Sequence, residues 1–248
     1  MFRLTLPPAR QGGAALLLLL AVLGLGAASV LMKGIARFDT RAGPERKTAA
    51  ALKEARDALV GFAATHGRLP RPALDAVSGR EFNGRCDTDA SCSGYLPWKT
   101  LGISPGDGWG RLLRYSATPV MTTAPLHPTV AVGKRTVLTR HGERLVYLVG
   151  NPECSLGRQC AAAVVLSSGR DNLGVSVHGV VQPGTATRNV DERVNALAGT
   201  VFVLRARGDG RGGDPHHQGG EFDDQLVWIP VDTILNRMSR AHMLPRAE

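Results

Sequence analysis

The chain has 248 residues, 43% of them hydrophobic, so it can bury one full-sized core, and its length fits one to two domains, with one favoured. Its formal net charge of +9 would suit nucleic acid or anionic lipid, or simply a solvated basic surface. The few aromatic residues do not alternate with the basic ones, and no nucleic-acid-binding motif is present. The composition therefore argues against a nucleic-acid partner.

The first predicted element is an uncharged apolar run of 19 residues, from Ala14 to Met32. A helix of that length rises about 28 Å, close to the thickness of the hydrocarbon core of a bilayer. We therefore predict a cytoplasmic leader at 1–13 and one transmembrane helix at 14–32. Cleavage by a signal peptidase is the alternative, because small residues at 26–28 precede Ser29.

Residues 33–69 are predicted to form a membrane-proximal segment followed by an amphipathic helix. Gly43 and Pro44 should interrupt the chain, Thr48 could cap the new helix, and Gly67 with Pro70 should end it. Within it, apolar residues recur at steps of three and four, at Leu52, Ala55, Leu59 and Phe62. This apolar stripe needs a sheet or core to lie on.

The rest of the chain, 70–248, is predicted to be a globular domain on a mostly antiparallel sheet, which makes the fold class α+β. The stretch 71–110 is dense in Gly, Pro, Ser and Asp and should form loops around a short element at 95–101. Short runs rich in Val, Leu, Tyr or Phe predict strands at 112–117, 144–149, 162–166, 175–181, 200–205 and 226–229. A short helix should follow from Asp232.

Four cysteines form two pairs with the same spacing, Cys86 with Cys92 and Cys154 with Cys160. Five-residue gaps fit zinc ligation poorly, so we predict two local disulfides, although the spacing alone also permits a cross-link between the loops. Basic residues flank the apolar run on both sides and do not decide its orientation. Because disulfides form outside the cytoplasm, the domain is predicted to lie in the periplasm, anchored in the bacterial inner membrane.

The glycine-rich run 208–220 is too low in complexity to bury anything and is predicted to be a surface loop. In and after it lie possible metal ligands, but the glycines give them no fixed geometry, and a flexible polar loop is the preferred interpretation. These weak metal candidates are Asp214, His216, His217, Glu221, Asp223 and Asp224. No cofactor is predicted.

Signals for catalysis are weak. Ser167 and Ser168 lack the nucleophile-elbow pattern, no phosphate-binding loop is present, and no base stands in a recognisable arrangement with a nucleophile. The isolated histidines are His66, His141 and His178. Three tryptophans are interpreted as core or loop anchors, and three aspartates as loop braces that accept backbone donors: Trp98, Trp109, Trp228, Asp107, Asp223 and Asp224. The sequence thus predicts a protein without catalytic residues.

Several stretches together resemble the minor pilin and pseudopilin-like proteins of type IV pilus and type II secretion systems. They are RQGGAALLLLLAVLGLG from Arg10, ALVGFAATHGRLPRP from Ala58, GYLPWKTLG from Gly94, DGWGRLLRY from Asp107, VVLSSGRDNLG from Val164, DERVN from Asp191 and FDDQLVWIPVDTILNRMSRAHMLP from Phe222. The resemblance touches most of the chain. It implies an N-terminal helix that anchors the subunit and later packs against other pilin-like subunits, with a sheet domain displayed outside.

The same resemblance implies processing by a prepilin peptidase after Gly13, with Ala14 as the first mature residue. The family's usual glutamate at the fifth mature position is replaced by Leu18, as in some subunits thought to sit at a filament tip. The expected partners are other pilin-like subunits, inner-membrane lipid and that peptidase. The alternative is a membrane-tethered periplasmic enzyme or ligand-binding domain whose site the sequence does not reveal.

Overall fold

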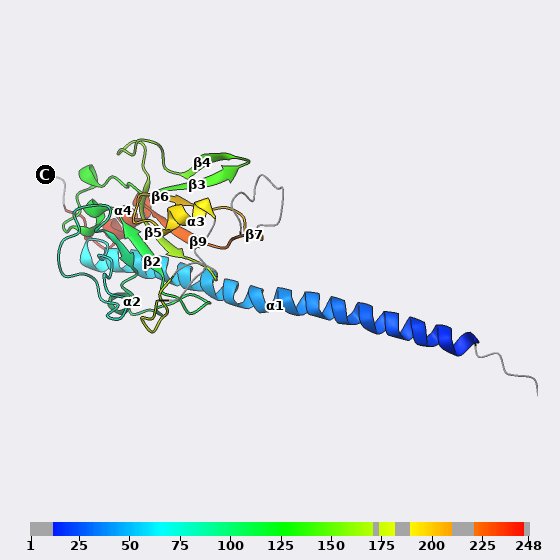
Figure 1. The fold of residues 1–248 in the computed structure, drawn as a ribbon. Helices are drawn as coiled ribbons and strands as arrows, with labels where there is room; N and C mark the ends of the chain where they lie inside the picture. Colours follow the sequence, from blue (N-terminus) through cyan, green and yellow to red (C-terminus); the bar gives the residue numbers. More distant parts are fainter. Residues whose placement is uncertain (1–11, 171–173, 182–188, 210–220, 246–248) are drawn as a thin grey trace, which may run out of the picture. The chain divides into compact units, whose positions relative to one another are not determined.

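The computed structural model describes residues 12–170, 174–181, 189–209 and 221–245 (Figure 1). The chain divides into two compact units, 1–43 and 44–248. In the described part, the first unit consists of residues of helix α1 (Gly12–His66). Its apolar side chains at Leu19, Leu20, Val22, Leu23 and Leu25 are 58–69% exposed.

The predicted membrane segment 14–32 falls within α1, so its helical backbone is as expected. Across the described residues, no helix meets the combination of length and apolarity needed to cross a membrane. Passage of 14–32 through a bilayer stays a prediction.

The predicted interruption at Gly43 and Pro44 is wrong, because Pro44 lies inside α1. Proline has no N–H and so removes one backbone hydrogen bond of the helix, but contacts within the second unit stabilise the helical turn at Pro44. The Thr48 hydroxyl donates to the Pro44 carbonyl at 2.9 Å and accepts from the Gly108 N–H at 3.1 Å. A side chain at Gly108 would collide with the Pro44 carbonyl. Thr48 is therefore an interior helix residue that receives a loop, and the prediction that it caps a helix is also wrong.

The central sheet of the second unit has four antiparallel strands in the order β1-β2-β5-β9. Their bounds are β1 (Ser93–Tyr95), β2 (Arg114–Ala117), β5 (Ala161–Ser167) and β9 (Gln225–Pro230). All seven residues of β5 are buried, because both faces of the sheet are covered. The α+β class with an antiparallel sheet is confirmed.

Helices cover one face of this sheet. The core there joins Leu52 and Leu59 of α1 with Tyr115 of β2, Val165 of β5 and Ile234 of α4 (Val231–Arg240), each at most 2% exposed. The amphipathic stripe predicted for α1 is thus confirmed, and so is the last helix.

A second sheet, in the order β4-β3-β6, covers the other face. Strands β3 (Thr136–His141) and β4 (Arg144–Val149) form an antiparallel hairpin, and β6 (Val201–Val203) runs parallel to β3. The core between the sheets contains Val137, Val164, Leu166, Phe202 and Leu226. Strands β7 (Gly208–Asp209) and β8 (Glu221–Phe222) form a separate ribbon.

The strand predictions agree with β4 at both ends and with β2, β5, β6 and β9 to within two residues. The strand predicted at 175–181 is wrong, because this stretch forms a tight turn with single bridges at Val175–Val181 and Arg111–Ser176. Sequence reasoning missed β3 and α3 (Val190–Ala196), and the element expected at 95–101 is the end of β1 followed by α2 (Trp98–Leu101). The other short helices in the described part of the chain are the 3-10 turns η1 (Pro119–Thr122) and η2 (Pro128–Val130).

Candidate functional site

A buried polar network lies where β5 ends and β9 begins, and Asp107 fixes its first part. Its Oδ1 accepts hydrogen bonds from the backbone N–H groups of Trp109 at 2.8 Å and Arg111 at 2.9 Å. Its Oδ2 accepts a hydrogen bond from the Ser167 hydroxyl at 2.6 Å. The interpretation of Asp107 as a loop brace is confirmed, and Ser167 is held as a donor at the end of β5.

Asp223 and the start of α3 form the second part of the network. The Asp223 Oδ2 accepts from the Arg170 N–H at 2.8 Å, and the Asp223 N–H donates to Glu192 Oε1 at 2.9 Å. Asn189 caps α3, since its Oδ1 accepts from the N–H groups of Asp191 at 2.9 Å and Glu192 at 3.4 Å. The cap thereby fixes the position of the Glu192 carboxylate beside Asp223.

Asn195 connects this network to the second sheet. Its Nδ2 donates to Asp224 Oδ2 at 2.8 Å and to the Val203 carbonyl at 2.9 Å, and its Oδ1 accepts from the Val203 N–H at 2.7 Å. All three residues are buried. Asp224 is therefore a brace too, and the Asn195 side chain is one of its partners.

The network gathers three buried carboxylates, Glu192, Asp223 and Asp224, with one oxygen of each within 4.8 Å of the others. An all-oxygen donor set is the kind that hard cations such as Ca²⁺ or Mg²⁺ take. Of the predicted metal candidates, Asp223 and Asp224 belong to this group, and Glu221 is half-buried in β8. Asp214, His216 and His217 lie outside the described residues.

Sequence reasoning missed Glu192, which lies 31 residues before Asp223. The only local signal was Asn189 followed by Asp191 and Glu192, the pattern of a capped helix start with acidic residues in its first turn. That signal predicts a helix and says nothing of the carboxylates that approach it.

A second ionic cluster centres on Asp191, which is 1% exposed. Its two oxygens accept from Arg140 Nε at 2.6 Å and Nη2 at 2.7 Å, and Arg205 Nε lies 3.1 Å from Oδ2. The hydrogen bonds to Asp191 raise the pKa of Arg140, whereas burial lowers the pKa of Arg205. The pair of guanidinium groups ties β3 and the chain after β6 to α3.

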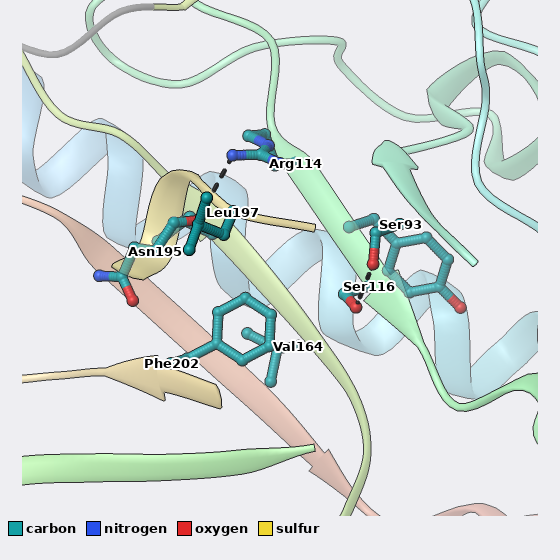
Figure 2. Close-up of a pocket in the computed structure, with 9 residues that line it drawn as sticks. Ser93, Arg114, Ser116, Val164, Asn195, Leu197 and Phe202 are labelled. Carbon is teal, nitrogen blue, oxygen red and sulfur yellow. Dashed lines mark hydrogen bonds between the residues drawn. The ribbon is translucent and has the colours of Figure 1, made fainter. Parts of the chain in front are cut away.

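A small cavity between β2 and α3 is shown in Figure 2, and its volume is about 10 Å³. A space of that size holds at most about one water molecule. At its edge, Arg114 Nη1 donates to the carbonyls of Asn195 at 3.3 Å and Ala196 at 2.7 Å at the end of α3. Burial lowers the pKa of Arg114. This cavity is too small for a substrate.

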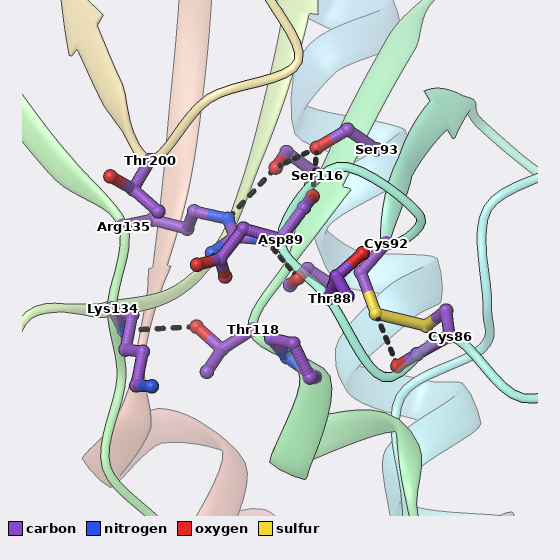
Figure 3. A network of polar contacts seen from close by, with 12 residues as sticks. Cys86, Thr88, Asp89, Cys92, Ser93, Ser116, Thr118, Lys134, Arg135 and Thr200 are labelled. Atoms are coloured by element: carbon purple, nitrogen blue, oxygen red, sulfur yellow. Dashed lines mark hydrogen bonds and ion pairs between the residues drawn. A yellow bond between two sulfur atoms is a disulfide. The ribbon is translucent and has the colours of Figure 1, made fainter.

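A third polar cluster surrounds Arg135, which is fully buried (Figure 3). Its Nε donates to the Ser116 hydroxyl at 2.8 Å, its Nη1 to Asp89 Oδ1 at 2.6 Å, and its Nη2 to the Ala117 carbonyl. Burial lowers the pKa of Arg135, and Asp89 opposes that shift. Because Asp89 belongs to the loop closed by Cys86 and Cys92, this loop supplies the counter-charge of a core residue.

Both predicted disulfides are present in the structure. Cys86 is bonded to Cys92, and Cys154 is bonded to Cys160. The predicted processing residues Gly13 and Ala14 lie in the first turn of α1.

Two larger cavities have volumes of about 340 Å³ and 230 Å³. The first is mainly apolar and includes Tyr95, Leu112 and Arg114 in its lining. The second has three arginines, of which Arg68 pairs with Glu81 at 2.8 Å and Arg85 with Asp87 at 3.2 Å; the third is Arg71. Burial acts to raise the pKa of Glu81, but the bonds from Arg68 and the Arg71 N–H outweigh it, and the pKa is lowered.

The remaining residues considered for catalysis are spread over the domain. His66 stacks on the Phe62 ring with centroids 3.8 Å apart, and His141 and His178 are exposed. The Ser167 hydroxyl also accepts from the Gly169 N–H at 3.2 Å, which closes a turn. The three tryptophans are half-buried; Trp98 lies against Gly79, and Trp228 packs against the core between the sheets.

Comparisons of this chain with protein-family models, with curated proteins and with solved structures find no match. Any functional assignment therefore rests on the residues and geometry described above.

Proposed function

We propose that this protein is a non-enzymatic, single-pass subunit of the bacterial inner membrane that acts by assembly. In this proposal it has a pilin-like fold and serves as a minor subunit of a type IV pilus or of a type II secretion pseudopilus. The main observation in favour of this proposal is that one helix, α1, contains both the uncharged run 14–32 and the stretch 52–63, which forms part of the domain core.

Three further features support this proposal. The exposed Leu19, Leu20 and Leu23 offer apolar surface that lipid or neighbouring helices would cover. Gly24 and Gly26 have no atom within 4 Å of an added Cβ, and small residues of this kind let helices approach closely. Two disulfides suit a domain outside the cytoplasm.

The alternative is a tethered enzyme or ligand-binding domain, and the carboxylate group of Glu192, Asp223 and Asp224 is the observation that favours it. Hydrogen bonds tie this group to two backbone N–H groups and to Asn195, which fits a brace between loops. Assembly is therefore the preferred function.

The test is the mature N-terminus of the protein isolated from cells with and without the prepilin peptidase. We expect Ala14 as the first residue only when the peptidase is present. Gly13→Val should block this cleavage, and the matched change Gly12→Val should leave it intact. A start at Ser29, or an intact Met1 with no pilus or secretion defect on deletion, would reject the assembly function.

A further inference from the structure

Strand β4 is an edge of the second sheet with an unusual surface. Among the described residues it pairs with β3 alone, and five of its six residues are exposed. Leu145, Val146, Tyr147 and Leu148 are 37–48% exposed, on both faces of the strand. By contrast β1, one of the two edges of the first sheet, has three residues and is bridged by Ala73.

Soluble proteins usually protect such an edge with charges, prolines, bulges or a covering segment, because its free N–H and C=O groups can pair with another chain. Strand β4 has no proline, and its single charged residue is Arg144, at the end next to the turn. A bulge leaves Leu148 without a partner in β3, whereas the three residues before it pair regularly with β3. The free edge is therefore regular over residues 145–147.

The hairpin turn determines which backbone groups are free. Gly142 and Glu143 form a two-residue turn, with Gly142 at φ +60°, so His141 and Arg144 form the first hydrogen-bonded pair. Pairs alternate along an antiparallel ladder, so Leu145 and Tyr147 direct their N–H and C=O groups away from β3. Leu145 and Tyr147 lie one residue before and one residue after Val146, so the free backbone groups are placed symmetrically about Val146.

We infer that two copies of this chain pair antiparallel along β4, about a two-fold axis at Val146. Leu145 of each copy then lies opposite Tyr147 of the other, and these two pairs exchange four backbone hydrogen bonds. Aliphatic and aromatic side chains facing each other across strands stabilise such a pair. Val146 lies opposite the same residue of the second copy.

Charges are compatible with a second copy as the occupant. Arg144 begins β4 and lies opposite the apolar Leu148 of the other copy, so no like charges face each other. The exposed Glu153 follows the opposite end of the strand. Antiparallel pairing therefore brings Arg144 of each copy, with the exposed Glu143 beside it, toward the end of β4 that Glu153 of the other copy follows, so charges of both signs meet at each end of the pair. This interface is independent of the proposed pilin function and involves no residue of α1.

The test is cross-linking of the full-length protein in detergent with single cysteines in β4. Val146→Cys should give a covalent dimer on mild oxidation, because residues facing each other in a non-hydrogen-bonded pair have Cα atoms about 4.5 Å apart, within disulfide range. The matched variant Tyr147→Cys should give at most a trace, because the two copies of residue 147 are diagonal neighbours about 7–8 Å apart.

A second substitution separates this interface from contacts through the N-terminal helix. Leu145→Lys in the Val146→Cys protein should abolish the dimer, whereas Leu74→Lys, at another exposed leucine, should leave it unchanged. Unaltered thermal unfolding of both would show that they fold. Equal cross-linking at 146 and 147, a dimer that survives Leu145→Lys, or no dimer with Val146→Cys would each overturn the inference.

Discussion

The two disulfide loops have the same sequence separation of 6, yet they are attached to the domain in different ways. In the loop 86–92, both cysteines are buried, and Asp89 reaches the fully buried Arg135 at 2.6 Å. This loop therefore carries a charge on which the core depends.

The loop 154–160 is joined to the domain mainly by neutral contacts. Gln159 accepts from the Gly133 N–H at 3.0 Å and donates to the Ala131 carbonyl at 3.1 Å, while Leu156 is 52% exposed. Equal spacing of the cysteines predicts the same disulfide closure in both loops. The loss of stability when a disulfide is removed also depends on the contacts of the loop with the rest of the domain.

Removal of the first disulfide, as Cys86→Ala with Cys92→Ala, should cause the largest loss of stability. Closing a loop of this length contributes about 2 kcal/mol in the chain-entropy model. A loosened loop also weakens the pair between Asp89 and Arg135, so we expect the free energy of unfolding to fall by about 4 kcal/mol. Urea denaturation of the full-length protein in detergent measures this. A loss no larger than that from opening the second loop would contradict the comparison.

Asp89→Asn isolates the ionic part of the first loop and keeps its disulfide. It leaves the Arg135 charge buried without a counter-ion, and we expect a loss of about 3 kcal/mol. The Asp89 side chain is 39% exposed, so water that reaches it keeps the loss at the lower end for a broken buried pair.

The same loop offers a matched control for that substitution. Asp87 pairs with Arg85, and their side chains are 66% and 77% exposed. Asp87→Asn should therefore change the free energy of unfolding by less than about 0.5 kcal/mol in the same urea titration. Equal effects of the two substitutions would show that Arg135 does not need its counter-charge.

A feature of the fold or of the candidate site could be predicted from the sequence where the residues that determine it lie close together in the chain. The spacing of Cys86 and Cys92 predicted their disulfide, and the apolar run bounded by a turn and a glycine predicted β4 with its correct ends. The steps of three and four from Leu52 predicted the buried side of α1. In each case the deciding residues lie within one turn, one strand or one loop.

The features that sequence reasoning missed depend on residues far apart in the chain. Arg135 reads as one more basic residue of a solvated surface, but Asp89, 46 residues earlier, neutralises it inside the core. Glu192 joins Asp223 only because an Asn-capped helix meets a loop 31 residues later. Likewise Pro44 reads as a helix end, but it lies inside α1, where Gly108 packs against its carbonyl and donates to Thr48, 60 residues earlier in the chain.

Removal of the second disulfide, as Cys154→Ala with Cys160→Ala, should destabilise the domain less than removal of the first disulfide or Asp89→Asn. The loss should be the closure contribution alone, about 2 kcal/mol, because no buried charge depends on this loop in the described contacts. Gln159 can keep its hydrogen bonds to Gly133 and Ala131 without the disulfide, because both partners lie outside the loop 154–160. Arg135, the partner of Asp89, exchanges two backbone hydrogen bonds with Ala161, next to Cys160. Adding Asp89→Asn to this variant should give the sum of the two separate losses, because neither substitution removes those backbone bonds. A loss clearly above that sum in urea denaturation would mean that the loops stabilise each other and are not independent staples.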